Sequence, residues 1–390
     1  MKPSSVMLIA GEASGDFLAA ELVAALRVEC VPQLPRFFGA GGPKMAAAGV
    51  ELAFDLTQYS VIGLWEAVRK YGQFKRLFDR LLHLACERQP DVIVCVDFSG
   101  FNRRFAAAIR REVRRRRGIF HNWSPKIVQY VSPQVWASRP SRAFQMARDY
   151  DLLLSILPFE KSWYAARVPE LRVEFVGHPI IERHAKVAVV KIDGQGSELL
   201  LLPGSRVSEL RRHLPPMLAA WKRIKAARPD VRARMVLPSD EMVRLTRTVV
   251  GDALDSVTLQ IGDLSEALAA ATAAIASTGT VTLECALFGV PTVAMYRTSW
   301  PTYLIGRQIV QVKYLAMPNL LADEPIYPEF IQSAATPENL EDAALKFLDN
   351  AELREVVKSK LTRVVQSLGE TGASGRAAKA ILELPESSSK

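Results

Sequence analysis

Cysteine is scarce in this sequence, and the four cysteines lie far apart with no CxxC pair. This argues against a disulfide framework and against a zinc site of the usual spacing, and it makes a reducing compartment the default. Long hydrophobic runs are also missing. The first apolar run, residues 6–10, is too short for the core of a signal peptide, and no run approaches the length of a membrane span. We therefore expect a cytoplasmic protein.

Acidic residues are outnumbered by basic ones. The 390 residues include 50 Lys and Arg against 41 Asp and Glu, which gives a net charge of +9. This excess suits an anionic partner, namely nucleic acid, an acidic lipid surface or a phosphorylated substrate. Hydrophobic residues at 49% and charged residues at 23% are ordinary globular values, and they exclude a disordered, collagenous or coiled-coil chain. The length is enough for two or more domains.

Short apolar runs alternate with helical patterns along the chain. Runs such as residues 6–10 are typical of strands buried on both faces, and segments such as 103–116 have helical spacing. This alternation predicts βαβ units and parallel sheets covered by helices on both faces. The strands that we expect are residues 6–10, 36–40, 92–96, 126–131, 152–157, 173–176, 198–202, 232–237, 257–261, 273–277 and 292–295.

The alternation lapses once, at residues 179–197, where proline, charged residues and Gly194-Gln195-Gly196 have the composition of a linker. We therefore predict an α/β fold of two Rossmann-like doubly wound domains that face a cleft, at residues 1–178 and 198–335. Residues 336–384 are expected to form closing helices that pack partly back on the first domain.

Ligands of an open parallel sheet bind beyond the carboxyl ends of its strands, so the loops there are the places to look for chemistry. The loop after the first strand, residues 11–16, has glycines that allow close backbone approach and a helix N-terminus that can face an anion. Glu12 and Ser14 are therefore candidate cleft residues. The loop is not GxGxxG, and a plain turn with Asp16 as helix N-cap is an equal alternative.

Asp97 directly follows the apolar run at residues 92–96. A partly desolvated carboxylate at this position can act as a general base, which takes a proton from an attacking hydroxyl. The alternative is an aspartate that only forms a turn or caps a helix.

Two loops of the second domain suit a pyrophosphate. Gly204, Ser205 and Arg206 follow a predicted strand, and an arginine can hold a pyrophosphate with two hydrogen bonds. The alternative here is a tight turn with an exposed arginine.

Gly279 and Thr280 also stand between a predicted strand and a helix, and Glu284 follows one helical turn later on the same face as Thr280. Amides and hydroxyls there suit phosphate, and the carboxylate can accept hydrogen bonds from ribose hydroxyls. The alternative is a capping box around Thr280.

Asn319 lies beside a proline, where an Asx turn would be favoured if the residue stood alone. Together with the other loops it points to a nucleotide diphosphate held mainly by the second domain.

The string Asp149-Tyr150-Asp151 matches the DxD of metal-dependent sugar transferases, but it precedes a strand. It therefore lies at the wrong end of the sheet, and we interpret it as structural.

With these loops in place, the sequence resembles the lipid-A-disaccharide synthase family of inverting sugar transferases, from residue 6 to about residue 380. The stretches that carry the resemblance are AGEASGD (10–16), GGPKM (41–45), YVSP (130–133) with VWA (135–137), LPFEK (157–161), GHP (177–179), LPGSR (202–206), STGT (277–280) with LE (283–284), and PNLL (318–321).

The resemblance implies a GT-B type fold with an N-terminal domain that faces acceptor and membrane and a C-terminal domain that binds the UDP-sugar. It implies a reaction that joins UDP-2,3-diacylglucosamine to 2,3-diacylglucosamine 1-phosphate, releasing UDP and forming a β(1→6) disaccharide 1-phosphate. Neither a metal nor another cofactor is expected.

The resemblance also assigns roles to residues. Asp97 matches the base that takes the proton of the acceptor 6-hydroxyl, and Arg206 and Asn319 match residues that the family needs for activity. Arg206, the amides of residues 279–280 and Asn319 would stabilise the departing pyrophosphate, and Glu284 would hold the ribose.

Two departures from the family pattern are visible. The family usually has Pro-Asp where this chain has Ser99-Gly100, and it usually has a second tryptophan where this chain has Ser138. The missing second carboxylate puts in doubt any mechanism that shares a proton between two carboxylates. Asp97 as sole base is unaffected.

Residues 60–82 fit an amphipathic helix that lies on a bilayer, with apolar side chains near one face and basic side chains for anionic headgroups. The alternative is a core helix with a solvated basic face. The candidate membrane contacts are Val61, Leu64, Trp65, Val68, Arg69 and Lys70.

Because both implied substrates carry acyl chains, we expect a peripheral protein on the cytoplasmic face of the inner membrane. A homodimer is left open.

We expect no nucleic-acid partner. The basic run at residues 110–117 ends a helix, where cations complement the dipole, and it lacks the aromatics of a stacking platform. His178 is a further candidate cleft residue, with a structural imidazole as the alternative.

Two other functions stay open at this point. One is a UDP-sugar epimerase on the same fold, which needs acid and base groups but no acyl acceptor. The other is a nucleotide-binding protein of the membrane surface without catalysis.

Overall fold

The computed structural model describes residues 3–59, 71–118, 122–185, 197–254 and 256–385. The chain divides into two compact units. The first contains Met1–Pro179 together with Gly369–Lys390, and the second contains Ile180–Leu368. The division at Pro179 falls at the start of the predicted linker, of which residues 186–196 lie outside the described residues.

The first unit has a seven-stranded sheet in the order β3-β2-β1-β4-β5-β6-β7, and every neighbouring pair is parallel. Its strands are β1 (Ser5–Ala10), β2 (Arg36–Gly41), β3 (Glu51–Asp55), β4 (Val92–Val96), β5 (Lys126–Tyr130), β6 (Leu152–Ser155) and β7 (Arg172–Phe175). Its helices are α1 (Ala13–Glu29), α2 (Pro43–Ala47), α4 (Tyr71–Arg88), α5 (Ser99–Arg116), α6 (Val135–Ser138), α7 (Arg142–Asp149), α8 (Glu160–Ala165) and α18 (Ala373–Leu382).

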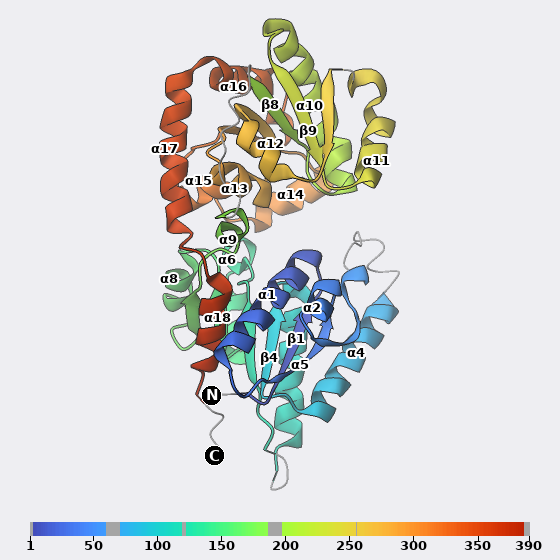
Figure 1. The fold of residues 1–390 in the computed structure, drawn as a ribbon, viewed down its shortest axis with the longest axis vertical. Coiled ribbons are helices and arrows are strands. Elements are labelled where there is room, and N and C mark those ends of the chain that lie inside the picture. The colour runs from blue at the N-terminus through green and yellow to red at the C-terminus, as the bar shows by residue number, and fades with distance from the viewer. Residues whose placement is uncertain (1–2, 60–70, 119–121, 186–196, 255, 386–390) are drawn as a thin grey trace. The chain divides into compact units, whose positions relative to one another are not determined.

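Both faces of this sheet are buried because its central strands are apolar at nearly every position. In β1, Val6 and Leu8 belong to one core with residues of α1 and α18, while Met7 and Ile9 belong to a second core with residues of α4 and α5. Helix α18, from the end of the chain, therefore lies against α1 in the first unit (Figure 1).

The second unit repeats this plan with a six-stranded parallel sheet in the order β10-β9-β8-β11-β12-β13. Its strands are β8 (Glu198–Leu202), β9 (Arg232–Leu237), β10 (Val257–Ile261), β11 (Ala273–Ser277), β12 (Thr292–Tyr296) and β13 (Glu329–Ile331). Its helices are α9 (Ile180–Ala185), α10 (Val207–Ala227), α11 (Asp240–Val250), α12 (Leu264–Ala270), α13 (Thr280–Leu287), α14 (Trp300–Ile309), α15 (Met317–Ala322), α16 (Pro337–Asp349) and α17 (Ala351–Ser367).

The two-domain α/β architecture is confirmed, and the predicted strands are all present. Strands β3 and β13 were not predicted from the sequence. Strand β3 is bounded by Glu51 and Asp55 and is half-buried at most positions, and β13 has only three residues, so neither gives a distinct apolar run. Among the described residues, no helix is both long enough and apolar enough to cross a membrane.

In each sheet the strand order reverses once. The reversal lies between β1 and β4 in the first unit and between β8 and β11 in the second. At such a switch point the loops after the two central strands diverge to opposite faces and leave a crevice in which ligands of doubly wound sheets bind. The loops after these four strands are those that hold most of the predicted site residues.

Candidate functional site

Asp97 begins the loop between β4 and α5, at the switch point of the first sheet. Its φ is 49° and that of Phe98 is 42°, so two consecutive residues that are not glycine adopt the left-handed conformation. Each such residue costs on the order of 1–3 kcal/mol unless the surroundings enforce it, and such strain concentrates at functional sites.

Buried amides hold the Asp97 backbone in place. The Asp97 N–H donates to the Tyr130 carbonyl at 2.9 Å. The Asp97 carbonyl accepts from Nδ2 of Asn102 at 2.8 Å and from Nε2 of Gln129 at 3.1 Å, and both of these side chains are fully buried. Asn102 and Gln129 were not singled out from the sequence. A polar residue within an apolar strand, such as Gln129 in β5, was the available signal.

Burial raises the pKa of the Asp97 carboxyl above its usual range, and a hydrogen bond from the Phe98 backbone opposes this shift. A carboxylate with a raised pKa is a stronger base than an ordinary aspartate, and general bases work best with pKa values near the operating pH. The geometry and the electrostatics at Asp97 therefore both suit proton abstraction.

The loop after β1 lies directly against the Asp97 loop. A Cβ added at Gly11 would overlap the Phe98 ring, so this close approach requires glycine. Glu12 is the N-cap residue of α1, and both Glu12 and Ser14 are exposed beside this contact. The structure therefore places both candidate cleft residues at the same switch point as Asp97.

Asp16 has a different role from the N-cap that was the alternative for this loop. Its buried carboxylate accepts hydrogen bonds from the backbone N–H groups of Gly42, Lys44 and Met45, at 2.8–3.0 Å. Asp16 therefore caps α2, the short helix after β2, and joins the loops after β1 and β2. Sequence spacing could not show this, because the two segments are 26–29 residues apart.

A second buried carboxylate lies at the same edge of the first sheet. Glu160 is 1% exposed, and its Oε1 accepts from Nε1 of Trp136 at 2.9 Å. Burial raises the pKa of Glu160 to about 7, although hydrogen bonds from Trp136 and neighbouring groups oppose the shift. The stretches that contain Trp136 and Glu160 were noted in the sequence, but no role was assigned to either residue.

In the second unit, Arg206 follows β8 at the switch point and is the N-cap residue of α10. Its side chain is 78% exposed and its Nη1 lies 3.1 Å from Oε1 of Glu209. The Glu209 carboxylate also accepts from the amides of Ser205 and Arg206, at 3.2 and 3.3 Å. Because Glu209 already uses these amides, the Arg206 guanidinium is the group of this loop that is most open to a ligand.

Gly204 is required in this loop for two reasons. Its φ is 109°, which side chains rarely tolerate, and an added Cβ would overlap the Glu209 carboxylate. A tight turn with an exposed arginine, the alternative for this loop, is therefore present, and Arg206 and Glu209 also form a capping box.

Gly279 and Thr280 follow β11, the neighbour of β8, and both are exposed at the N-terminus of α13. Glu284 lies one turn further along α13. Burial raises the pKa of Glu284, and the positive charge of Arg183 opposes this rise. The second unit thus brings Gly204, Arg206 and the Gly279–Thr280 turn to one switch point.

Asn319 is completely buried in α15 and does not present its amide to a ligand. Its Nδ2 donates to the Tyr327 carbonyl at 2.7 Å and to Oε1 of Glu329 at 2.8 Å, and its Oδ1 accepts from the Tyr327 amide at 2.7 Å. These bonds tie α15 to the segment that leads into β13. The geometry favours a positioning role over the direct contact expected from the sequence.

His178 follows β7, the edge strand, which is three strands from β4. At the usual strand spacing β7 lies roughly 14 Å from β4, so His178 follows a strand that is not part of the switch point. The predicted membrane contacts Val61, Leu64, Trp65, Val68, Arg69 and Lys70 all lie outside the described residues. The rest of the predicted amphipathic segment, within α4, packs inward, since Leu81 is fully buried in the first unit's core.

The basic residues at the end of α5 are partly neutralised. Arg110 forms an ion pair with Asp151 at 2.6 Å, and Arg115 forms one with Glu112 at 2.7 Å. The Asp151 carboxylate also accepts from the Ile127 amide, so the DxD string has the structural role that we expected. Within the described residues, no three His, Cys, Asp or Glu side chains are grouped as metal ligands.

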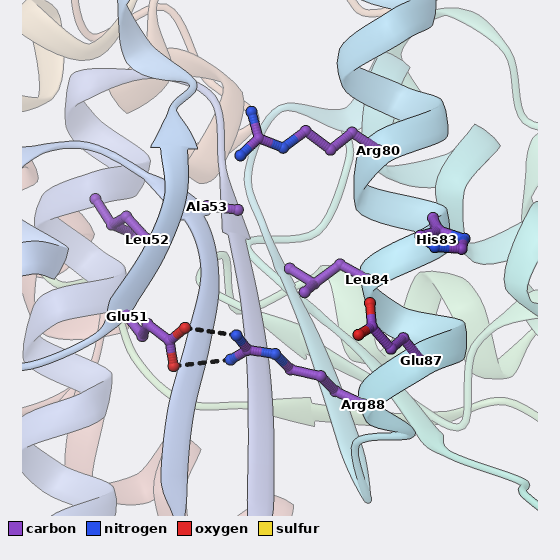
Figure 2. Close-up of a pocket in the computed structure, with 8 residues that line it drawn as sticks. All are labelled: Glu51, Leu52, Ala53, Arg80, His83, Leu84, Glu87 and Arg88. Atoms are coloured by element: carbon purple, nitrogen blue, oxygen red, sulfur yellow. Dashed lines mark hydrogen bonds and ion pairs between the residues drawn. The ribbon is translucent and has the colours of Figure 1, made fainter.

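A separate cavity of about 380 Å³ lies between β3 and α4 in the first unit (Figure 2). Arg88 donates two hydrogen bonds to the Glu51 carboxylate, of 2.5 and 2.8 Å. Figure 2 shows this pair across the lower end of the cavity. Its lining includes two arginines and two glutamates, so its charge is balanced, and it does not include the switch-point loops. It is therefore not the candidate active site.

Two doubly wound units in one chain, each with a glycine-containing loop at its switch point, form the architecture of the GT-B fold. The sequence identifies the chain further. The chain matches the lipid-A-disaccharide synthetase family model over residues 6–383, and it belongs to that family.

Individual relatives agree with this assignment. The chain is 36% identical to the lipid-A-disaccharide synthase of Myxococcus xanthus, over 98% of each chain. It is also 36% identical to the enzyme of that name from Nitrosococcus oceani, over 93% of this chain and 92% of the relative.

Solved structures show the fold. A glycotransferase of kitacinnamycin has a TM-score of 0.64 at 18% identity, with 99% of this chain and all of that chain covered. The UDP-GlcNAc 2-epimerase of Neisseria meningitidis has a TM-score of 0.58 at 10% identity, with 97% and 98% covered. The epimerase alternative therefore rests on fold alone, and it is not supported by the relatives that share about a third of their residues with this chain.

Proposed function

We propose that this chain joins UDP-2,3-diacylglucosamine to 2,3-diacylglucosamine 1-phosphate, which forms the β(1→6) lipid A disaccharide 1-phosphate and UDP with inversion at the anomeric carbon. The near full-length match to the lipid-A-disaccharide synthetase family carries this proposal. The two switch-point sites supply the groups that the reaction needs, one basic carboxylate in the first unit and anion-binding loops in the second.

In this proposal Asp97 takes the proton of the acceptor 6-hydroxyl while that oxygen attacks the anomeric carbon. Its raised pKa makes it a more effective base than an exposed aspartate, and the buried amides of Asn102 and Gln129 fix its position. Glu12 and Ser14, on the adjoining loop, contact the acceptor in this proposal.

The second unit handles the donor. The exposed Arg206 guanidinium and the amides of Gly279 and Thr280 stabilise the negative charge that develops on the departing pyrophosphate. Glu284 accepts a hydrogen bond from a ribose hydroxyl. Asn319 acts indirectly, because its three hydrogen bonds hold the segment from α15 to β13 beside these loops.

We further propose that the protein acts as a peripheral enzyme on the cytoplasmic face of the inner membrane. Both substrates in the proposal carry two acyl chains, so the enzyme has to meet them at a bilayer surface. The basic excess of the sequence suits anionic headgroups, and the segment at residues 61–70 stays the predicted contact in the first unit.

The direct test is an assay with both acylated sugars in detergent micelles and mass detection of products. Wild-type protein should form the disaccharide 1-phosphate only when both substrates are present, and it should do so in the presence of EDTA. Conversion of the UDP-sugar without acceptor would show epimerase chemistry instead, and UDP binding without any turnover would show a non-catalytic protein.

A further inference from the structure

Helix α14 is unusual in the second unit because it buries none of its residues. Trp300 is 59% exposed, Leu304 55% and Ile305 59%, and Val310, the residue after the helix, is 40% exposed. Trp300 and Leu304 share one face by their spacing of four, and Ile305 lies beside Leu304. A continuous apolar strip of this kind marks an interaction surface, whereas single exposed apolar residues do not.

The charge on α14 itself has one sign. Between Glu284 and Asp323 the sequence contains no other acidic residue, while it contains Arg297, Arg307 and Lys313. Lys313 lies 3.7 Å from Asp323 in an exposed ion pair, so Arg307 supplies the positive charge of the helix. Arg307 belongs to α14 itself and lies over the Tyr303 ring, 5.8 Å from its centre. The strip is therefore accompanied by cations and aromatic rings, the combination that is typical of helices lying in a membrane interface.

The start of α14 is fixed beside the donor loops. Nδ1 of His213 lies 2.8 Å from the Pro203 carbonyl, and the Arg297 amide donates to Nε2 of the same ring at 3.0 Å. One buried imidazole thus joins the loop that carries Arg206 to the segment that leads into α14. Burial lowers the pKa of His213, which favours the neutral ring that this pair of bonds requires.

The Gln332 side chain holds the next residue, Thr298. The Thr298 amide donates to Oε1 of Gln332 at 3.0 Å, and Nε2 of Gln332 donates to the Thr298 carbonyl at 2.8 Å. The segment before α14 is therefore held by two side chains, His213 and Gln332, while α14 itself buries none of its residues. Figure 1 shows α14 and α13 at the same end of the second unit, where the donor loops lie.

We propose that α14 is a membrane-contacting helix of the second unit, with Trp300, Leu304 and Ile305 entering an anionic bilayer surface next to the donor site. Arg307 then meets lipid phosphates. This inference rests on the proposed function, in which the donor is an acylated UDP-sugar that has to be drawn from the bilayer. A membrane contact beside the pyrophosphate loops leaves the acyl chains of the donor near the lipid.

A second copy of the chain fits this surface less well. In a symmetric dimer the same patch meets itself, so Arg307 would face its own copy, and α14 contains no acidic residue to pair with it. An anionic lipid surface complements the same cation.

The first experiment measures binding to vesicles of phosphatidylglycerol and phosphatidylcholine. The double variant Leu304→Glu with Ile305→Glu should lower the affinity about tenfold or more, because it removes two apolar contacts and adds two negative charges. The matched control is Val28→Glu with Val31→Glu, which changes two residues of the first unit that are even more exposed, by the same charge. Equal vesicle affinity of the two double variants would overturn the proposal.

The second experiment locates the contact. Brominated lipids quench tryptophans that enter the bilayer, and the six tryptophans include Trp300 and the predicted contact Trp65. Quenching that persists in Trp65→Phe and falls in a variant that also carries Trp300→Phe supports the proposal. Quenching that is unchanged by Trp300→Phe would refute it, even if the variants of Leu304 and Ile305 folded poorly.

Two outcomes separate this inference from others. A dimer that dissociates in the Leu304→Glu, Ile305→Glu variant, with vesicle binding unchanged, would assign α14 to self-association and contradict the membrane contact. Turnover by wild-type protein in detergent micelles tests the proposed function independently, so a failed activity and a failed membrane contact cannot be confused.

Discussion

Asp97 is held by its backbone, through hydrogen bonds to its N–H and its carbonyl, and this leaves its carboxyl group available for chemistry. This loop contains two consecutive left-handed residues, and two fully buried side-chain amides hold it in place. Such an arrangement is expected where the direction of a single side chain matters.

The raised pKa of Asp97 leads to a prediction about pH. A general base works only when it is deprotonated, so kcat/KM should fall as the pH drops through the pKa of Asp97 in the free enzyme. Because burial raises this pKa, the fall should begin at a higher pH than it would for an exposed aspartate. A pH–rate profile measures this directly, and an acid limb at the usual pKa of aspartate would contradict the account.

Glu160 predicts a pH dependence of stability. Its pKa is about 7 in the folded protein and 4.5 in the reference state. The folded state therefore holds this proton to a higher pH than the unfolded chain. The stabilisation is complete below about pH 4.5 and is lost as the pH rises to about 7, a change of roughly 3 kcal/mol.

Denaturant unfolding at several pH values tests this prediction. The free energy of unfolding of wild type relative to Glu160→Gln should fall between pH 5 and pH 8. The exposed Glu87→Gln serves as the control and should show no such trend relative to wild type. Parallel curves for wild type and Glu160→Gln would show that Glu160 is already ionised in the folded protein.

At the scale of elements, a substitution in helix α5 can test the role of the missing second carboxylate. Gly100 is the second residue of α5, it is exposed, and a Cβ added there meets no atom within 4 Å. The first turn of α5 contains no acidic residue. Gly100→Asp should therefore stabilise the protein by about 1 kcal/mol, through helix propensity and the helix dipole.

The same variant tests the mechanism. If Asp97 is the sole base, Gly100→Asp should leave kcat/KM within about twofold of wild type, and Gly100→Asn provides the uncharged control. A large gain in kcat/KM that appears only with Asp at this position would mean that the reaction uses two carboxylates.

The elements also show what the sequence could and could not reveal. Buried strands such as β1 and β4 are predictable, because a parallel sheet with two covered faces requires apolar residues at every position. The positions of Asp97, Arg206 and Gly279 at the carboxyl ends of strands follow from the same periodicity, whereas the strand order that makes these places switch points does not. The functions of Asp16, Asn319 and Glu160 do not, because each depends on contacts with segments that the local pattern does not indicate.

At the scale of the whole molecule, the two units have separate cores and should respond separately to perturbation. Ile381 in α18 is fully buried in the first unit's core, so Ile381→Ala should destabilise that unit by about 2–4 kcal/mol. UDP should instead protect the second unit, whose loops form the proposed donor site, by about 2.7 kcal/mol at a hundredfold excess over its Kd.

Hydrogen exchange followed by mass spectrometry can assign each effect to a unit. Ile381→Ala should speed exchange in β1 and β4 and leave β8 and β11 unchanged, whereas UDP should slow exchange around Gly279. The exposed Lys379→Ala, on the same helix, is the control for Ile381. Protection by UDP in the first unit would contradict the placement of the donor site.

The central claim is that this chain makes the lipid A disaccharide with Asp97 as base and Arg206 at the pyrophosphate. The most direct measurement is the rate of disaccharide 1-phosphate formation by Asp97→Ala and Arg206→Ala, followed by mass spectrometry, with thermal unfolding to confirm that both variants are folded. The account predicts that each folded variant loses disaccharide formation. Turnover near the wild-type rate in either variant would contradict the role assigned to that residue.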